Sequence, residues 1–141
     1  FHPGGNIGKN LLTVQDIMIS GNKIPKINLS QNIHEAIKEI NKKKLGLVVV
    51  VKGNNVQGIV TDGDARRSMS HFSKKVTVGK IMTKNPHSIN QDLLASKALS
   101  IMNEKKITSL IVTKNQKNKS KSHKKLIGII HIHALLEYGI K

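Results

Sequence analysis

A short segment in the first half of the chain places a hydroxyl and a carboxylate three residues apart at a predicted strand end. It reads Gly58-Ile59-Val60-Thr61-Asp62-Gly63-Asp64. A helix that starts there offers unpaired N–H groups and a positive dipole end, which suit a phosphate. Thr61 can donate a hydrogen bond to a phosphate oxygen, and Asp64 can accept from both hydroxyls of a ribose. The segment predicts either a nucleotide site or, more simply, a helix that Thr61 and Asp64 cap.

Residues on either side of Asp64 extend this candidate site. Gly63 permits close backbone approach to a ligand because it has no side chain. Arg66 and Arg67 follow directly and can add positive charge at the phosphate end of the ligand. Asp62 and these residues are the ligand-binding residues that we predict around Thr61 and Asp64.

The elements that must position this motif occur twice. The segment 14–18, Val-Gln-Asp-Ile-Met, is echoed by 78–82, Val-Gly-Lys-Ile-Met, and each is followed by a proline that breaks a helix, Pro25 and Pro86. Each copy is predicted to run helix, strand, helix, strand, strand, helix. A unit repeated in this way buries its apolar faces by packing against its partner.

The long helix of each copy is predicted from apolar residues at helical spacing. Asn32, with Glu35 three residues later, predicts a capping box for the first helix. Asp92 is the predicted cap of the second helix. The apolar stripes are Ile33, Ala36, Ile37 and Ile40 in the first copy, and Leu94, Ala98, Ile101 and Met102 in the second.

Strands follow each long helix, at 47–51 and 56–60 in the first copy and at 110–112 and 126–130 in the second. Short closing helices are predicted from about Asp64 and about Ala134. The fold class is therefore α/β (α+β), with two β-α-β-β-α repeats packed as a pseudo-two-fold pair. We assign residues 14–73 and 74–141 to the two domains and residues 1–13 to a linker.

The second copy departs from the first where the ligand would bind. Its segment Gly128-Ile129-Ile130-His131-Ile132-His133-Ala134 replaces the threonine with His131 and the aspartate with Ala134. Each unpaired sugar hydroxyl costs about 1 kcal/mol or more when buried, so a nucleotide is predicted to prefer the first copy. His131 and His133 lie on one face of an extended chain, and we expect one to face the ligand and the other to pack. We predict no metal there, because the chain has no Cys and no nearby carboxylate is obvious before Glu137.

The net charge of +16 raises the possibility of nucleic-acid binding. Aromatic residues make up only 2%, so few side chains can stack on bases. Just two of the 24 basic residues are arginine, the residue best suited to bidentate binding of phosphate. No membrane segment or signal peptide is evident, and the lack of cysteine agrees with a cytoplasmic protein. The Lys-rich segment 114–125 is predicted to be a solvated hairpin loop.

The two units resemble a tandem pair of cystathionine-β-synthase (CBS) domains, the Bateman module, whose nucleotide pattern Gly58-Ile59-Val60-Thr61-x-x-Asp64 matches. More closely, the chain resembles the C-terminal part of bacterial D-arabinose 5-phosphate isomerases. The strings that carry this resemblance are Phe1-His2-Pro3-Gly4-Gly5, Gly8, Leu11-Leu12, Asp16-Ile17-Met18, Ile24-Pro25, Thr61-Asp62-Gly63-Asp64, Arg66-Arg67, His131-Ile132-His133 and Gly139-Ile140.

The resemblance implies a parent enzyme that interconverts ribulose 5-phosphate and arabinose 5-phosphate for Kdo and lipopolysaccharide synthesis. Its catalytic sugar-isomerase (SIS) domain would precede this chain, and His2 would belong to that catalytic site, so this fragment alone is expected to be inactive. The resemblance adds Ile24 and Pro25 to the ligand-binding residues. Expected ligands are AMP, ATP or the nucleotide sugar CMP-Kdo, and expected partners are the isomerase domain and a second copy of the module. A structural oligomerisation platform and a nucleic-acid binder are the alternatives.

Overall fold

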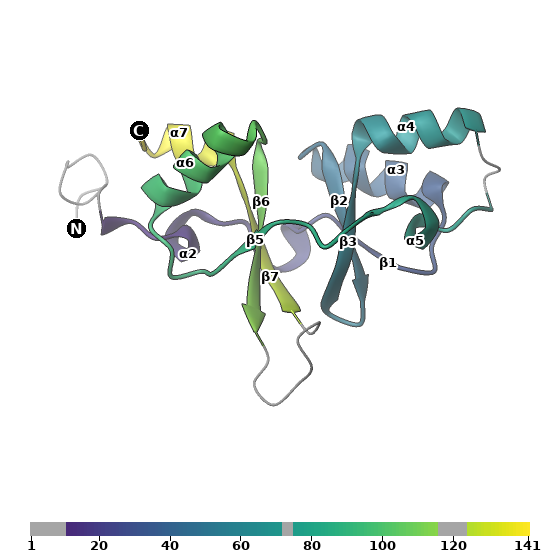
Figure 1. Ribbon diagram of the computed structural model, residues 1–141, viewed down its shortest axis with the longest axis horizontal. Helices are drawn as coiled ribbons and strands as arrows, with labels where there is room; N and C mark the ends of the chain where they lie inside the picture. Colours follow the sequence, from purple (N-terminus) through teal and green to yellow (C-terminus); the bar gives the residue numbers. More distant parts are fainter. Residues whose placement is uncertain (1–10, 72–74, 116–123) are drawn as a thin grey trace. The chain divides into compact units, whose positions relative to one another are not determined.

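The computed structural model describes residues 11–71, 75–115 and 124–141, which form an α+β fold with two compact units (Figure 1). The first-repeat unit is centred on Asn22–Pro86. The second-repeat unit combines the residues up to Gly21 with His87–Lys114 and Leu126–Lys141. The helices and strands follow the order that the repeat predicted, with one 3-10 turn and one short two-residue strand in addition, and the predicted fold class is confirmed.

The first-repeat unit is built on a small mixed sheet. Its strands are β1 (Lys26–Asn28), β2 (Leu47–Lys52), β3 (Asn55–Thr61) and the short β4 (Thr83–Lys84). Strand β2 lies between β1, which runs parallel to it, and β3, which runs antiparallel, and β4 pairs with β3. The helices α3 (Ile33–Lys43) and α4 (Asp62–His71) pack against each other beside this sheet (Figure 1).

Helix α3 forms where the apolar stripe and the capping residues predicted it. Ile33, Ala36 and Ile40 are buried in the core of the unit. The Asn32 side chain accepts a hydrogen bond from the Glu35 N–H at 2.9 Å, which confirms the predicted cap. The helix feeds into β2, whose residues 48–51 are fully buried, as expected of an uninterrupted β-branched run.

The second-repeat unit repeats this plan with shorter outer strands. It contains β5 (Ser88–Ile89), α6 (Ala95–Lys105), β6 (Ser109–Asn115), β7 (Lys124–His131) and α7 (Ile132–Glu137). The strand order is β7-β6-β5, and β5 runs parallel to β6. The strands predicted at 110–112 and 126–130 are thus confirmed, and the predicted loop at 114–125 falls largely on 116–123, outside the described residues.

The predicted start of the long helix in the second repeat is wrong, for a physical reason. Asp92 does not cap α6, which begins at Ala95 with Leu94 as its N-cap and no side-chain cap bond. The Ala95 N–H is instead bonded to the Leu12 carbonyl at 2.8 Å, so a distant backbone group satisfies the helix start.

The closing helices α4 and α7 begin at Asp62 and Ile132, two residues before the predicted starts at Asp64 and Ala134. In both cases the first N–H of the helix reaches a carbonyl that precedes the neighbouring strand, Gly46 for Asp62 and Thr108 for Ile132. The strand therefore turns into the helix without an intervening loop.

The short leading helix of each repeat packs into the unit of the other repeat. Helix α2 (Val14–Ile17) belongs to the second-repeat unit, and α5 (Val78–Ile81) belongs to the first-repeat unit. Val14 and Ile17 are buried in the core formed by the second repeat, and Val78 is buried in the core formed by the first. The repeats therefore exchange their first helices.

Two glycines permit this exchange. A Cβ atom on Gly58 would lie 2.6 Å from the Thr83 carbonyl oxygen and 2.8 Å from Met82 Sδ. A Cβ atom on Gly128 would likewise lie 2.5 Å from Met18 Sδ. Each glycine sits in the strand that precedes a closing helix, so the exchanged segment crosses that strand at a distance that only glycine allows.

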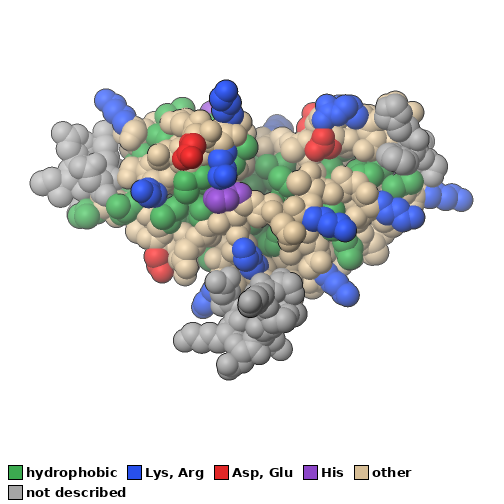
Figure 2. Space-filling model, in the orientation of Figure 1, with side chains coloured by type: hydrophobic (Ala, Val, Ile, Leu, Met, Phe, Trp, Pro, Cys, Tyr) green, Lys and Arg blue, Asp and Glu red, His purple; other side chains and the backbone are tan. Residues whose placement is uncertain are grey.

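Within the described residues, none of the helices combines the length and apolar character needed to cross a membrane. On the face shown in Figure 2, Lys and Arg side chains are scattered over each unit and interspersed with Asp and Glu. The described residues on this face therefore present dispersed positive charge rather than one continuous basic track.

Candidate functional site

The site is built at the end of β3, where the strand passes directly into α4. Thr61 is the last residue of the strand and Asp62 the first of the helix. Thr61 Oγ1 accepts a hydrogen bond from the Asp64 N–H at 3.2 Å, so the threonine caps the helix. A hydroxyl that accepts in this way keeps its own proton, and Thr61 can still donate to a ligand oxygen.

The backbone at this helix start offers one further donor. The Asp62 N–H is bonded to the Gly46 carbonyl at 2.9 Å and the Asp64 N–H to Thr61. Gly63 lies between them, and a helix supplies no carbonyl for the N–H of its second residue. The Gly63 amide and the Thr61 hydroxyl therefore form a pair of donors suited to an anion.

The charged residues of the motif are paired along the helix. Arg66 Nε donates to Asp62 Oδ1 at 2.9 Å, and Arg67 donates to Asp64 Oδ1 at 2.5 Å. The arginine side chains are 57% and 71% exposed, so these pairs contribute little to stability and a ligand can replace them. Both carboxylates are paired with guanidinium groups and remain 40% exposed, so ribose hydroxyls would compete with Arg67 for Asp64.

Strand register brings Ile24 and Pro25 to the same end of the sheet as Thr61. The Val49 N–H is bonded to the Pro25 carbonyl at 2.9 Å, just before β1 begins to pair with β2. On the other side of β2, Leu47 is paired with Thr61. Two strand spacings separate the outer strands, about 10 Å, a span that a nucleotide can bridge.

Leu47 is a residue that the sequence motif did not reveal. It is half-buried at the start of β2, between the Ile24–Pro25 segment and Thr61. The sequence did carry a signal for Leu47, because β2 and β3 are consecutive antiparallel strands. The first residue of β2 must then lie at the same end of the sheet as the last residue of β3. Its counterpart in the second repeat is Ser109, the first residue of β6.

The equivalent junction of the second repeat has different chemistry. His131 ends β7, and its Nδ1 accepts a hydrogen bond from the His133 N–H at 3.1 Å. The amide that corresponds to Gly63 is therefore already bonded, and Ala134 supplies no carboxylate. Ser109 contributes a buried hydroxyl that has no hydrogen-bond partner among the described residues.

The imidazole of His131 is neutral when it caps the helix. An Nδ1 acceptor requires the proton to sit on Nε2. Burial lowers the pKa of His131, and the neighbouring His133 lowers it further. The two rings lie edge to face with their centroids 4.7 Å apart. His133 belongs to α7 and is exposed, so the two residues do not share an extended strand.

Among the described residues, no group of three or more His, Cys, Asp or Glu side chains could hold a metal ion. His2 lies outside the described residues. A groove of about 370 Å³ lies between β1 and α3, and its lining includes none of the predicted site residues. It is lined by charged and polar side chains with one apolar residue: Lys26, Ile27, Gln31, Glu35, Lys38, Glu39 and Lys42.

The chain matches the family described as "CBS domain" over residues 14–71 and again over residues 78–141. Two solved CBS structures are similar in fold. CBSX2 from Arabidopsis thaliana, solved in complex with AMP, has a TM-score of 0.72 and 21% identity, covering 91% of this chain and 96% of that chain. A CBS domain pair solved with 5′-methylthioadenosine and S-adenosyl-L-methionine has a TM-score of 0.73 and 20% identity, covering 90% and 94%.

A curated relative at higher identity is a longer protein. Arabinose 5-phosphate isomerase KdsD of Francisella tularensis is 38% identical over 143 residues, which cover 99% of this chain and 42% of the isomerase. The chain therefore spans less than half the length of this relative. The double match confirms the tandem arrangement that the sequence repeat predicted, and the chain belongs to the CBS domain family.

Proposed function

We propose that this chain is a regulatory CBS pair that binds one adenine nucleotide at the β3–α4 junction of its first repeat. The observation that carries the proposal is the set of groups at that junction. The Thr61 hydroxyl and the Gly63 amide can donate to a phosphate, and Asp64 can accept from a ribose. We propose that the buried Ile24–Pro25 segment, which lies at the same end of the sheet, supplies an apolar wall for the ligand.

The solved relatives support an adenine nucleotide as the ligand class. AMP is bound to CBSX2, and the other CBS pair carries two adenosine derivatives. No similar structure named here carries CMP-Kdo, so this nucleotide sugar enters the proposal only as a competing ligand. Occupancy can act on another domain only if the ligand binds two arrangements of the module with different affinity.

The proposed target of this regulation is an arabinose 5-phosphate isomerase domain in the same protein, as the 38% identity to KdsD suggests. The residues that the structure describes contain no set of bases around a sugar-phosphate pocket. We therefore expect the isolated chain to show no turnover of ribulose 5-phosphate. In a protein that joins this chain to an isomerase domain, AMP is expected to change the rate of isomerisation.

The binding proposal is tested by calorimetric titration of AMP, ATP and CMP-Kdo into the wild-type chain and Asp64→Ala. Loss of the two ribose hydrogen bonds to a carboxylate is expected to weaken AMP binding about tenfold or more. Asp92→Ala is the matched control, because Asp92 is an exposed carboxylate on the other unit. Equal AMP affinity in wild type and Asp64→Ala would contradict the role of Asp64, and no heat with any ligand would reject the sensor.

A second candidate function is a structural platform that brings copies of the protein together. It is favoured by the internal pairing of the motif, because Thr61 caps α4 and Arg67 neutralises Asp64 without any ligand. Light scattering separates the two functions. A stable dimer that binds none of the three nucleotides would support the platform.

A further inference from the structure

We propose that Glu39 and Lys43 of α3 form a clamp that fixes the Ile24–Pro25 segment and so sets the nucleotide affinity of the first-repeat site. The inference deepens the proposed function and rests on it. Neither residue belongs to the sequence motif, and both act on the ligand only through the segment that they hold. They are therefore positioning residues.

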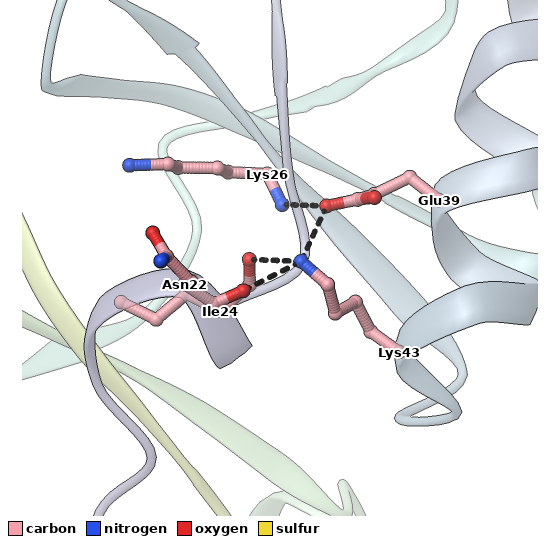
Figure 3. A network of polar contacts seen from close by, with 5 residues as sticks. All are labelled: Asn22, Ile24, Lys26, Glu39 and Lys43. Carbon is pink, nitrogen blue, oxygen red and sulfur yellow. Dashed lines mark hydrogen bonds and ion pairs between the residues drawn. The ribbon is translucent and has the colours of Figure 1, made fainter.

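The contacts of the clamp are shown in Figure 3. Lys43 Nζ donates to the Asn22 carbonyl at 2.7 Å, to the Ile24 carbonyl at 3.4 Å and to Glu39 Oε2 at 3.2 Å. The same carboxylate oxygen accepts the Lys26 N–H at 3.2 Å. The two side chains thus hold the backbone on both sides of Pro25.

The chemistry of the two groups explains why they hold firmly. An ammonium carries three N–H donors, and Lys43 has three acceptors. Its side chain is only 19% exposed and that of Glu39 only 20% exposed, so water competes poorly for these bonds. A lysine in the last turn of α3 also interacts favourably with the negative end of the helix.

The segment needs this support because the sheet holds it weakly. The 3-10 turn at Gly21–Lys23 and the two residues after it precede β1. Within the part of the chain that the structure describes, their one backbone hydrogen bond to the sheet runs from the Val49 N–H to the Pro25 carbonyl. If the clamp is lost, Ile24 and Pro25 remain tethered but gain freedom. A ligand that must first order this segment binds more weakly, because the segment then loses conformational entropy on binding.

The clamp is tested with Lys43→Met, which removes the charge and the donors but keeps an unbranched side chain. We expect AMP affinity measured by calorimetry to fall about fivefold or more. Lys42→Met is the matched control, because Lys42 is the exposed neighbour on the same helix, and it is expected to stay within about twofold of wild type. Lys43→Arg keeps donors for the carbonyls and is expected to restore most of the affinity.

Two outcomes would overturn the inference while leaving the proposed function intact. One is a Lys43→Met chain that binds AMP as tightly as wild type, and the other is an equal loss in Lys42→Met. If the wild-type chain binds no AMP, the proposed function fails, and amide hydrogen exchange of residues 22–27 decides about the clamp. Faster exchange in Lys43→Met, with unchanged exchange in Lys42→Met, supports a clamp, and equal rates in both variants reject it.

Discussion

Thr61 and His131 occupy equivalent strand ends and cap the helix that follows, but their chemistry differs. The Thr61 hydroxyl accepts the Asp64 N–H and keeps a proton for a ligand. The His131 imidazole accepts the His133 N–H and occupies the amide that a phosphate would need. A single change of residue type therefore converts a possible ligand contact into a purely internal one.

This cap makes stability depend on pH through His131. The unfolded imidazole has the ordinary pKa of 6.5, and the pKa in the folded chain is lower. As pH falls below 6.5, the unfolded state takes up the proton first, so the stabilising effect of the neutral cap is complete above that value and is lost as pH falls toward the lowered pKa.

The measurement is urea unfolding at about pH 7.5 and about pH 5.5, on either side of the ordinary histidine pKa. His131→Asn keeps an acceptor for the His133 N–H but does not titrate, so the loss of stability at the lower pH is expected to be smaller than in wild type. His34→Asn, at an exposed position, is the control for general histidine effects. An identical loss in wild type and His131→Asn would show that His131 does not couple folding to pH.

At the scale of elements, the sequence predicted correctly those features that depend on residues close together in the chain. The α3 cap at Asn32 and the buried strand β2 followed from neighbouring residues and are confirmed. The α6 start was wrong because its first N–H is satisfied by Leu12, more than eighty positions away. The Lys43 clamp escaped prediction for the same reason, since its carbonyl partners lie 19 and 21 residues earlier.

For the candidate site as well, the residues close together in sequence could be predicted and the contacts that depend on the fold could not. Thr61 and Asp64 were proposed from their spacing alone, because a strand end and a helix start are adjacent in sequence. The ion pairs of Arg66 and Arg67 required the true start of α4, since a helix that begins at Asp62 brings residues three and four apart together. Leu47 required the register of β2 against β3.

The exchange of leading helices predicts that two strand glycines are essential for packing. Gly58→Ala and Gly128→Ala each force a methyl group against the exchanged segment, and each is expected to lower the free energy of unfolding by about 1–3 kcal/mol. Gly63→Ala is the control, because its Cβ would meet only the end of the exposed Arg67 side chain, at 3.2 Å.

Chemical denaturation with a common slope for all variants measures these changes in unfolding free energy. A Gly58→Ala or Gly128→Ala chain as stable as wild type would mean that α5 and α2 do not cross these strands closely. The two variants test the two exchanged segments independently, because the glycines belong to different compact units.

At the scale of the whole molecule, two copies of one scaffold carry different residues at the strand ends proposed for ligand binding. The first offers a hydroxyl, a free amide, a carboxylate and an apolar residue, in Thr61, Gly63, Asp64 and Leu47. The second presents at the matching positions His131, His133, Ala134 and Ser109. Duplication accounts for the shared fold, and these substitutions account for the expectation of one nucleotide per chain rather than two.

The most direct test of the account is an AMP titration of the isotope-labelled chain, followed residue by residue through its amide NMR signals. We predict saturable shifts at 61–65 and 22–27, with one AMP bound per chain and much smaller shifts at 131–135. Saturable shifts centred on His131 and Ala134, with the signals of Thr61 and Asp64 unmoved, would contradict the account.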